Sequence, residues 1–205
     1  MARKTKAEAE QTRRQIIDAA RKVFHTLGVS RTTLEKIAQE AGVTRGAVYW
    51  HFKDKQDLFF AVREHATLPL VDQVDERLLD AGQADPLAGI EQALLRIFTV
   101  LEGDPSARET FEIMIFRCEY VAEFTPVLER INGSCDDLAI KLQGAYRRAA
   151  ERGLLRPGLD PALVAQETVY FLTGAVDRWL AGPEPARVTP AWRALIAQHI
   201  ALRRA

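Results

Sequence analysis

The sequence predicts an all-α protein, and three features of the chain support this. Apolar residues recur at spacings of three and four through most of the 205 residues, as in helices with one buried face. A capping side chain stands directly before a proline, the residue favoured at the first helical position, in Asp85-Pro86, Asp104-Pro105, Asp160-Pro161 and Thr189-Pro190. Alternating apolar and polar runs of useful length are lacking, so we expect no sheet and about nine helices.

Residues 32–58 predict two short helices joined by a tight turn. Thr32, with Glu35 three residues later, has the pattern of a capping box that starts the first helix. Gly42 ends that helix because glycine accepts the left-handed backbone of a helix end. Thr44 caps the second helix, which is about two turns long, and Asp54 caps the helix after it. An amphipathic helix expected near residues 12–28 would complete a three-helix unit.

The helix that begins at Asp54 is expected to continue to about Leu79, with Pro69 kinking or breaking it. It starts beside the two short helices and ends in the rest of the protein, which makes it a candidate lever between them. Further helices are expected near residues 86–102, 105–121, 126–152, 161–181 and 190–203.

The second short helix carries side chains suited to DNA. Arg45 and Tyr49 share one face, while Val48 and Phe52 face inward. Arginine can bond two acceptors of a guanine, and a helix-turn-helix places such a helix in the major groove. A buried helical hairpin would explain the apolar residues, but not the polar and aromatic run 49–51. The residues expected to contact DNA are Thr33, Lys36, Thr44, Arg45, Gly46, Tyr49, Trp50, His51, Lys53 and Lys55.

Around these positions the chain resembles the TetR family of bacterial transcription regulators. The resemblance lies in Ala38, Ala41-Gly42-Val43, Gly46, Tyr49, His51-Phe52, Lys55 and Leu58. The opening residues and the run GVTRGAVYWHFKDK are similar to the type that represses multidrug efflux pumps. The similarity is dense over residues 1–60 and thins to scattered points beyond them.

The resemblance implies a helix-turn-helix DNA-binding domain over residues 1–53 and a helical ligand-binding and dimerisation domain over residues 54–205. It also implies a homodimeric repressor on a palindromic double-stranded operator, controlling a multidrug efflux operon. A small hydrophobic effector would release it. A DNA-binding protein that ignores small molecules fits the residues almost equally well, so that alternative stays open.

The effector site is implied by the same resemblance. Carried over position by position, its lining would include Ile97, Phe98, Phe111, Ile115 and Thr173. Phe111 and Ile115 stand where repressors of the efflux type carry polar side chains, so the pocket is expected to be drier, smaller or filled. Glu112 lies in the same apolar segment, where it would pair with Arg117 or serve a cationic ligand. Aromatic residues at helical spacing are equally typical of a core.

The two C-terminal helices, expected over residues 161–181 and 190–203, are apolar on more than one side. Such a helix packs on its own core with one side and on another surface with the other. A second subunit related by a two-fold axis would supply that surface, and a wide intramolecular core is the alternative. The expected interface residues are Phe171, Leu172, Val176, Trp179, Trp192, Leu195 and Ile196.

The net charge is zero, but the charges are unevenly distributed. Residues 1–65 hold 13 Lys and Arg against 8 Asp and Glu, and the remainder holds 15 against 20. This places an anionic partner at the N-terminal end. The N-terminal basic residues fit either an arm that contacts DNA beside the second short helix or a frayed terminus. These residues are Arg3, Lys4 and Lys6.

Other functions are disfavoured by what the sequence lacks. No apolar stretch is long enough to span a membrane, and no apolar leader begins the chain, so a cytoplasmic protein is expected. Cys118 and Cys135 are 17 residues apart without a nearby histidine, which favours buried thiols over a metal site or a redox switch. No nucleophile stands near a base, which disfavours an enzyme with an appended helical hairpin, and no catalytic residue, metal or cofactor is expected.

Overall fold

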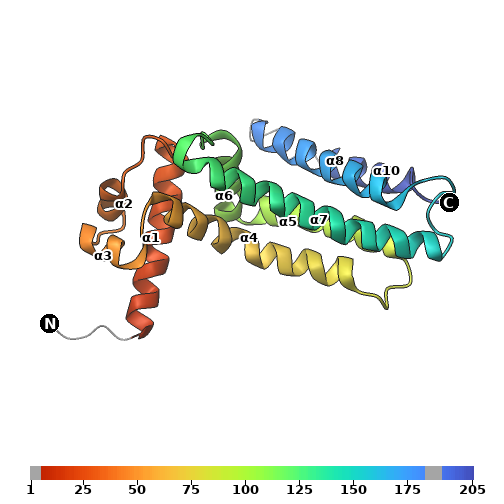
Figure 1. Ribbon diagram of the computed structural model, residues 1–205, viewed down its shortest axis with the longest axis horizontal. Coiled ribbons are helices and arrows are strands. Elements are labelled where there is room, and N and C mark those ends of the chain that lie inside the picture. The colour runs from red at the N-terminus through yellow and green to blue at the C-terminus, as the bar shows by residue number, and fades with distance from the viewer. Residues whose placement is uncertain (1–5, 183–190) are drawn as a thin grey trace. The chain divides into compact units, whose positions relative to one another are not determined.

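The computed structural model describes residues 6–182 and 191–205, which fold into helices (Figure 1). In chain order these are α1 (Lys6–Leu27), α2 (Leu34–Glu40), α3 (Arg45–His51), α4 (Lys55–Leu79), α5 (Pro86–Gly103), α6 (Pro105–Phe116), the 3-10 turn η1 (Ala122–Phe124), α7 (Thr125–Glu151), α8 (Pro161–Ala181) and α10 (Ala191–Ala201). Within these ranges the only β-type pairing is one bridge between Leu155 and Arg204, which confirms the all-α prediction. The expected cap at Thr189-Pro190 and the basic residues Arg3 and Lys4 lie outside the described ranges.

The helices form two compact units. The first comprises Met1–Leu68 and Asp104–Leu128, and the second comprises Pro69–Gly103 and Glu129–Ala205. This division differs from the predicted boundary between residues 53 and 54, because α6 and η1 pack with the N-terminal helices. The assignment of DNA binding to residues 1–53 and of ligand binding to residues 54–205 stays a prediction.

Aromatic side chains contribute to the mainly aliphatic core of the first unit. Phe24 of α1 and Phe59 of α4 are almost fully buried, with their ring centres 5.9 Å apart. Phe124 of η1 meets Phe59 edge-on at 5.6 Å. Tilted and edge-on ring pairs of this kind add to the stabilisation from burial alone. The start of α4 and the turn before α7 are therefore part of the core that supports the short helices.

The cap of α2 differs from the prediction by one residue. Thr33, rather than Thr32, is the N-cap, and its hydroxyl accepts a hydrogen bond from the Lys36 N–H. The Thr32 side chain is buried and donates instead to the carbonyl of Gly28, at 2.8 Å. The cap predicted for α3 is confirmed, because the Thr44 hydroxyl accepts a hydrogen bond from the N–H of Ala47, the third residue of α3, at 3.2 Å.

The long helix α4 does not break at Pro69, contrary to one of the two predicted outcomes. Asp54 caps its start as expected, accepting a hydrogen bond from the Asp57 N–H at 2.9 Å. Pro69 lies inside the helix, and the boundary between the two units falls just before it. A proline removes one backbone donor, but the remaining hydrogen bonds continue the helix. Helix α6 is shorter than predicted and ends at Phe116.

The second unit is built from the later part of α4 with α5, α7, α8 and α10. Phe98 of α5 is fully buried, stacks on Trp192 of α10 at 4.8 Å, and meets Trp179 of α8 edge-on at 6.1 Å. On α4, Asp75 pairs with Lys141 of α7 at 2.6 Å. The aromatic contacts join α5, α8 and α10, and the ion pair joins α4 to α7. Among the described residues, none of the helices combines the length and the apolar character that a membrane span requires.

Candidate nucleic-acid interface

The turn between α2 and α3 fixes which side of α3 faces outward. Gly42 has a φ of 64°, a left-handed conformation that glycine adopts without strain. The next N–H, that of Val43, donates to the Ala38 carbonyl at 3.0 Å and closes the end of α2. Ile37 of α2 and Val48 of α3 are both fully buried. With Val48 anchored inward, the opposite face of α3 is left to the solvent.

That outward face of α3 carries Arg45, Tyr49 and Trp50. Tyr49 is 47% exposed and Trp50 is 72% exposed, although both side chains are large and partly apolar. An amphipathic ring left in water is available for contact with a partner. Arg45 and Tyr49 lie together on the surface, as their spacing of four predicted, and Trp50 is exposed as well.

The guanidinium group of Arg45 is held by two neighbours. Its Nη2 donates to the Tyr49 hydroxyl at 3.3 Å, and its central carbon lies 5.3 Å from the centre of the Tyr49 ring. Its Nη1 lies 2.7 Å from Oε1 of Glu35, a residue of α2. Sequence reasoning gave Glu35 only a capping role and missed this ion pair, because it joins two helices across the turn.

The family is shown by comparison with known proteins. The description "Bacterial regulatory proteins, tetR family" matches residues 16–62, which run from α1 into α4. The HTH-type transcriptional regulator TtgR of Pseudomonas putida is 36% identical over 186 residues, which cover 90% of this chain and 87% of that protein. The chain belongs to the TetR family. It is accordingly a regulator of transcription with a helix-turn-helix, and not an enzyme.

Two solved structures extend the similarity of this TetR-family chain over the whole fold. NalD, described as the secondary repressor of the MexAB-OprM multidrug efflux pump in Pseudomonas aeruginosa, superposes with a TM-score of 0.83 at 31% identity, covering 98% of each chain. SmeT in complex with triclosan superposes with a TM-score of 0.84 at 31% identity, covering 95% of this chain and 92% of that one. Each of the two units thus has its counterpart in these structures.

The other residues predicted to contact DNA differ in exposure and in the contacts they make within this TetR-family regulator. His51 is half-buried, with its ring edge-on to Trp50 at 4.4 Å. Lys36 is exposed, and its ammonium group donates to the Arg31 carbonyl at 2.9 Å. The remaining predicted residues on the surface of α2, α3 and the next turn are all exposed, namely Thr33, Thr44, Gly46 and Lys53.

Lys55, which was also expected to contact DNA, makes several contacts within the protein, and its role at DNA stays a prediction. Its ammonium group donates to the Val29 carbonyl at 3.1 Å, and it lies 3.8 Å from the Glu123 carboxylate. It also lies 5.5 Å from the centre of the Phe124 ring. Lys55 thus connects the start of α4 to the loop after α1 and to η1, and its charge is satisfied within the protein. The sequence does not show that Glu123, which is 68 residues away along the chain, lies beside Lys55 in the fold.

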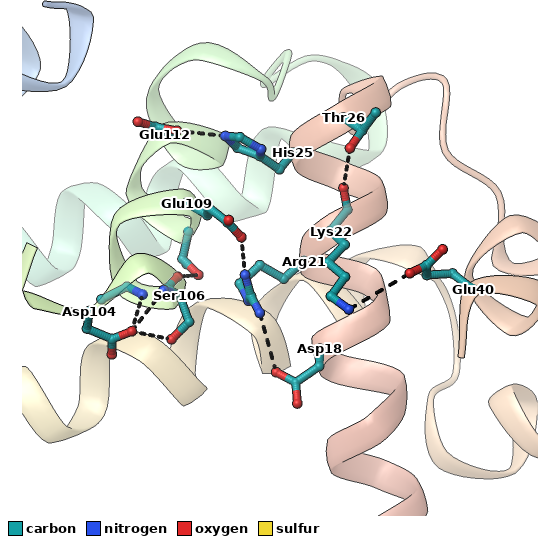
Figure 2. A network of polar contacts seen from close by, with 12 residues as sticks. Asp18, Arg21, Lys22, His25, Thr26, Glu40, Asp104, Ser106, Glu109 and Glu112 are labelled. Atoms are coloured by element: carbon teal, nitrogen blue, oxygen red, sulfur yellow. Dashed lines mark hydrogen bonds and ion pairs between the residues drawn. The ribbon is translucent and has the colours of Figure 1, made fainter. Parts of the chain in front are cut away.

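Helix α6 is tied to α1 by an ion pair and a histidine–carboxylate hydrogen bond that the sequence did not predict (Figure 2). Arg21 of α1 lies between Asp18 and Glu109 and pairs with both. One turn further along α1, Nε2 of His25 lies 2.6 Å from Oε2 of Glu112. The paired residues are spaced by about one helical turn on each helix, so they face each other in register. This contact attaches α6 to the first unit.

The residues predicted to line an effector pocket are divided between the two units. Phe111, Glu112 and Ile115 belong to the first unit, and Ile97, Phe98 and Thr173 belong to the second. Glu112 pairs with His25, a partner that the sequence did not suggest. Ile97 and Phe98 are core residues, Phe111 is half-buried, and Ile115 and Thr173 are exposed. Their role in binding an effector stays a prediction.

The seven residues predicted for a subunit interface also divide into two groups. Four of them are buried within the single chain, and their part in a subunit interface stays a prediction: Leu172, Val176, Trp192 and Ile196. Phe171 and Trp179 are half-buried and Leu195 is exposed. Sequence reasoning passed over Leu163 and Tyr170 of α8, each 65% exposed. Periodicity alone could not tell the inner from the outer side of a helix that is apolar on both.

Proposed function

We propose that this TetR-family regulator is a repressor that binds a palindromic operator as a homodimer and is released by a small lipophilic ligand. The observation that supports DNA binding best is the exposed group of Arg45, Tyr49 and Trp50 on a helix anchored by Val48. Arginine donates two parallel hydrogen bonds to the major-groove edge of guanine. Aromatic and lysine side chains beside it suit the sugar-phosphate backbone.

Dimerisation is inferred from apolar side chains on the surface of the second unit. Leu163 and Tyr170 of α8 and Leu195 of α10 are exposed in the single chain. A two-fold pairing through these helices would cover them and would present two α3 helices to one duplex. Half-sites one helical turn apart, about 34–36 Å, would then match the protein's symmetry.

The regulated genes and the effector are inferred from the relatives. NalD is described as a repressor of a multidrug efflux pump, and SmeT has been solved with triclosan. By similarity, this regulator would act in the bacterial cytoplasm. The genes it controls would be a multidrug efflux operon. The effector would bind better to a conformation whose α3 spacing does not fit DNA, so that effector and operator oppose each other's binding.

The DNA-binding part is tested with an operator selected by the protein from duplexes of randomised sequence. Arg45→Ala should weaken binding to that operator about 5- to 150-fold and blur the preference at one base pair of each half-site. Arg147→Ala, which removes the same charge from an exposed position on α7, serves as the control. Equal affinities for the wild type and Arg45→Ala would refute the assignment of α3 to base recognition.

The effector part is tested with triclosan and a panel of other lipophilic antimicrobial compounds. A compound that binds only the folded protein raises its melting temperature, and a releasing effector also lowers its affinity for the operator. If no compound changes either quantity, the protein is a DNA-binding regulator that ignores small molecules of this class.

A further inference from the structure

We propose that Glu35 of α2 sets the sequence specificity of DNA binding by holding Arg45 of α3 in one orientation. Because Arg45 reads a base only if the chain binds an operator, this role rests on the proposed function. In this proposal Glu35 does not contact DNA itself. It is a positioning residue that acts through Arg45, the side chain proposed to distinguish base pairs.

The guanidinium group of Arg45 is fixed from two sides. The Glu35 carboxylate lies 2.7 Å from Nη1, and the Tyr49 hydroxyl accepts from Nη2 at 3.3 Å. The Tyr49 ring also lies within cation–π distance, at 5.3 Å from the guanidinium carbon. Contacts at both terminal nitrogens restrict the rotation of a long side chain that is otherwise free to sweep the surface.

These contacts leave Arg45 able to read a base. A guanidinium has five N–H donors, and Glu35 and Tyr49 engage two of them. A bidentate bond to guanine uses two donors, so enough donors remain. A side chain already held in its binding orientation loses less conformational entropy on binding, which is the general advantage of preorganisation.

The capping geometry of α2 leaves Glu35 available for this role. In a capping box the carboxylate belongs to the third helical residue after the N-cap. Because Thr33 is the N-cap, that position is occupied by Lys36, and Glu35 is the second residue of the helix. Hydrogen bonds from its own backbone N–H and from the Thr33 hydroxyl, followed by the charge of Arg45, keep the pKa of Glu35 below its usual value. The carboxylate is therefore anchored on α2 and charged when it faces Arg45.

The charge of Glu35 is also expected to weaken binding to DNA of any sequence, although it raises specificity. The side chains of Arg45 and Glu35 are 61% and 52% exposed, so both reach the surface that meets DNA. A carboxylate there repels phosphates, and it occupies an arginine that would otherwise bind any phosphate, a contact that carries no sequence information. Glu35 is thus expected to lower general affinity for DNA while raising discrimination between sequences.

The test compares Glu35→Gln with Glu40→Gln. Both variants remove one negative charge from α2, but Glu40 lies 4.0 Å from Lys22 of α1 and serves as the matched control. Binding is measured on the selected operator, on operators with each base pair replaced in turn, and on a scrambled duplex, over a range of salt concentrations. Melting temperatures establish that both variants are folded.

Glu35→Gln is expected to lower the preference at the base pair read by Arg45 about 2- to 5-fold, the size of effect measured for exposed ion pairs. Binding to the scrambled duplex should become tighter, with a log–log salt slope steeper by about 0.9 for each phosphate newly contacted. Glu40→Gln should leave the preference at every position unchanged. In an Arg45→Ala background, Glu35→Gln should produce no further loss of preference.

Two results would overturn this role for Glu35. One is the same base preference in Glu35→Gln as in Glu40→Gln. The other is a loss of preference that persists in the Arg45→Ala background, since Glu35 would then contact a base itself. A wild-type protein that binds all duplexes alike would instead refute the proposed function, and the role of Glu35 with it.

Discussion

Lowering the pH from neutral is expected to destabilise the protein through His199 of α10. Nε2 of His199 lies 3.0 Å from the Thr168 hydroxyl, which in turn lies 2.8 Å from the Tyr146 hydroxyl. The imidazole also stacks on the Phe171 ring at 4.1 Å and is almost completely buried. Burial, and then the nearby charge of Arg203, lower the pKa of His199 to about 4. The neutral ring is therefore the form that the fold accommodates.

The size of the effect follows from the difference in proton binding between the two states. In the unfolded chain His199 has its ordinary pKa of 6.5, so between pH 6.5 and about 4 the unfolded state binds a proton that the folded state does not. The free energy of unfolding consequently falls as the pH falls through this window. A difference of about 2.5 pKa units corresponds to about 3 kcal/mol, or about 2 kcal/mol after allowance for screening by nearby solvent. The contribution is complete above pH 6.5 and lost below about pH 4.

The assay is urea unfolding followed by tryptophan fluorescence at several pH values between 7 and 4, for the wild type and for His199→Gln. Groups that titrate in both proteins cancel in the difference between their unfolding free energies, provided that the protomer concentration is the same. His65→Gln, a change at an exposed histidine of α4, is the control and should follow the wild type. A difference between wild type and His199→Gln that stays constant with pH would refute the reasoning.

Three further predictions concern side chains whose surroundings the structure defines. Phe98→Ala should lower the free energy of unfolding by about 3–5 kcal/mol in urea titrations, because Phe98 is fully buried and stacked on Trp192; a loss below about 1 kcal/mol would indicate an open pocket wall there. Lys55→Ala should lower the melting temperature by about 2–4 °C through loss of its bond to Val29, and leave the salt slope of operator binding unchanged. A shallower salt slope in Lys55→Ala would show that Lys55 contacts a phosphate of the operator. Burial raises the pKa of Cys118 to about 11, so at pH 8 it should react with iodoacetamide about a hundredfold more slowly than an ordinary thiol, as followed by mass spectrometry; rapid alkylation would contradict this.

Features set by neighbouring residues could be predicted from the sequence. Asp104 and Asp160 cap α6 and α8 as expected, because each carboxylate bonds N–H groups two or three residues ahead. The outward position of Arg45 and Tyr49 likewise follows from their spacing of four and from the apolar Val48 beside them. Such contacts depend on the local backbone alone, so the order of residues is enough to determine them.

Features that the local pattern misjudged, or that join distant segments, were decided by the tertiary structure. The sequence pattern favours Thr32 as the cap of α2, but the Thr32 hydroxyl donates to the Gly28 carbonyl and Thr33 is the cap. Lys55 points to Val29 and Glu123 because the fold brings these groups to it.

The sequence by itself determined the helices, the outward face of α3 and the resemblance to a family of regulators. Only the tertiary structure placed Glu35 against Arg45, attached α6 to α1 through Arg21 and His25, and put half of an apolar helix face inside the core. The physical reason is that a helix is selected by interactions within four residues, whereas its partners are selected by packing among segments that the chain order leaves far apart.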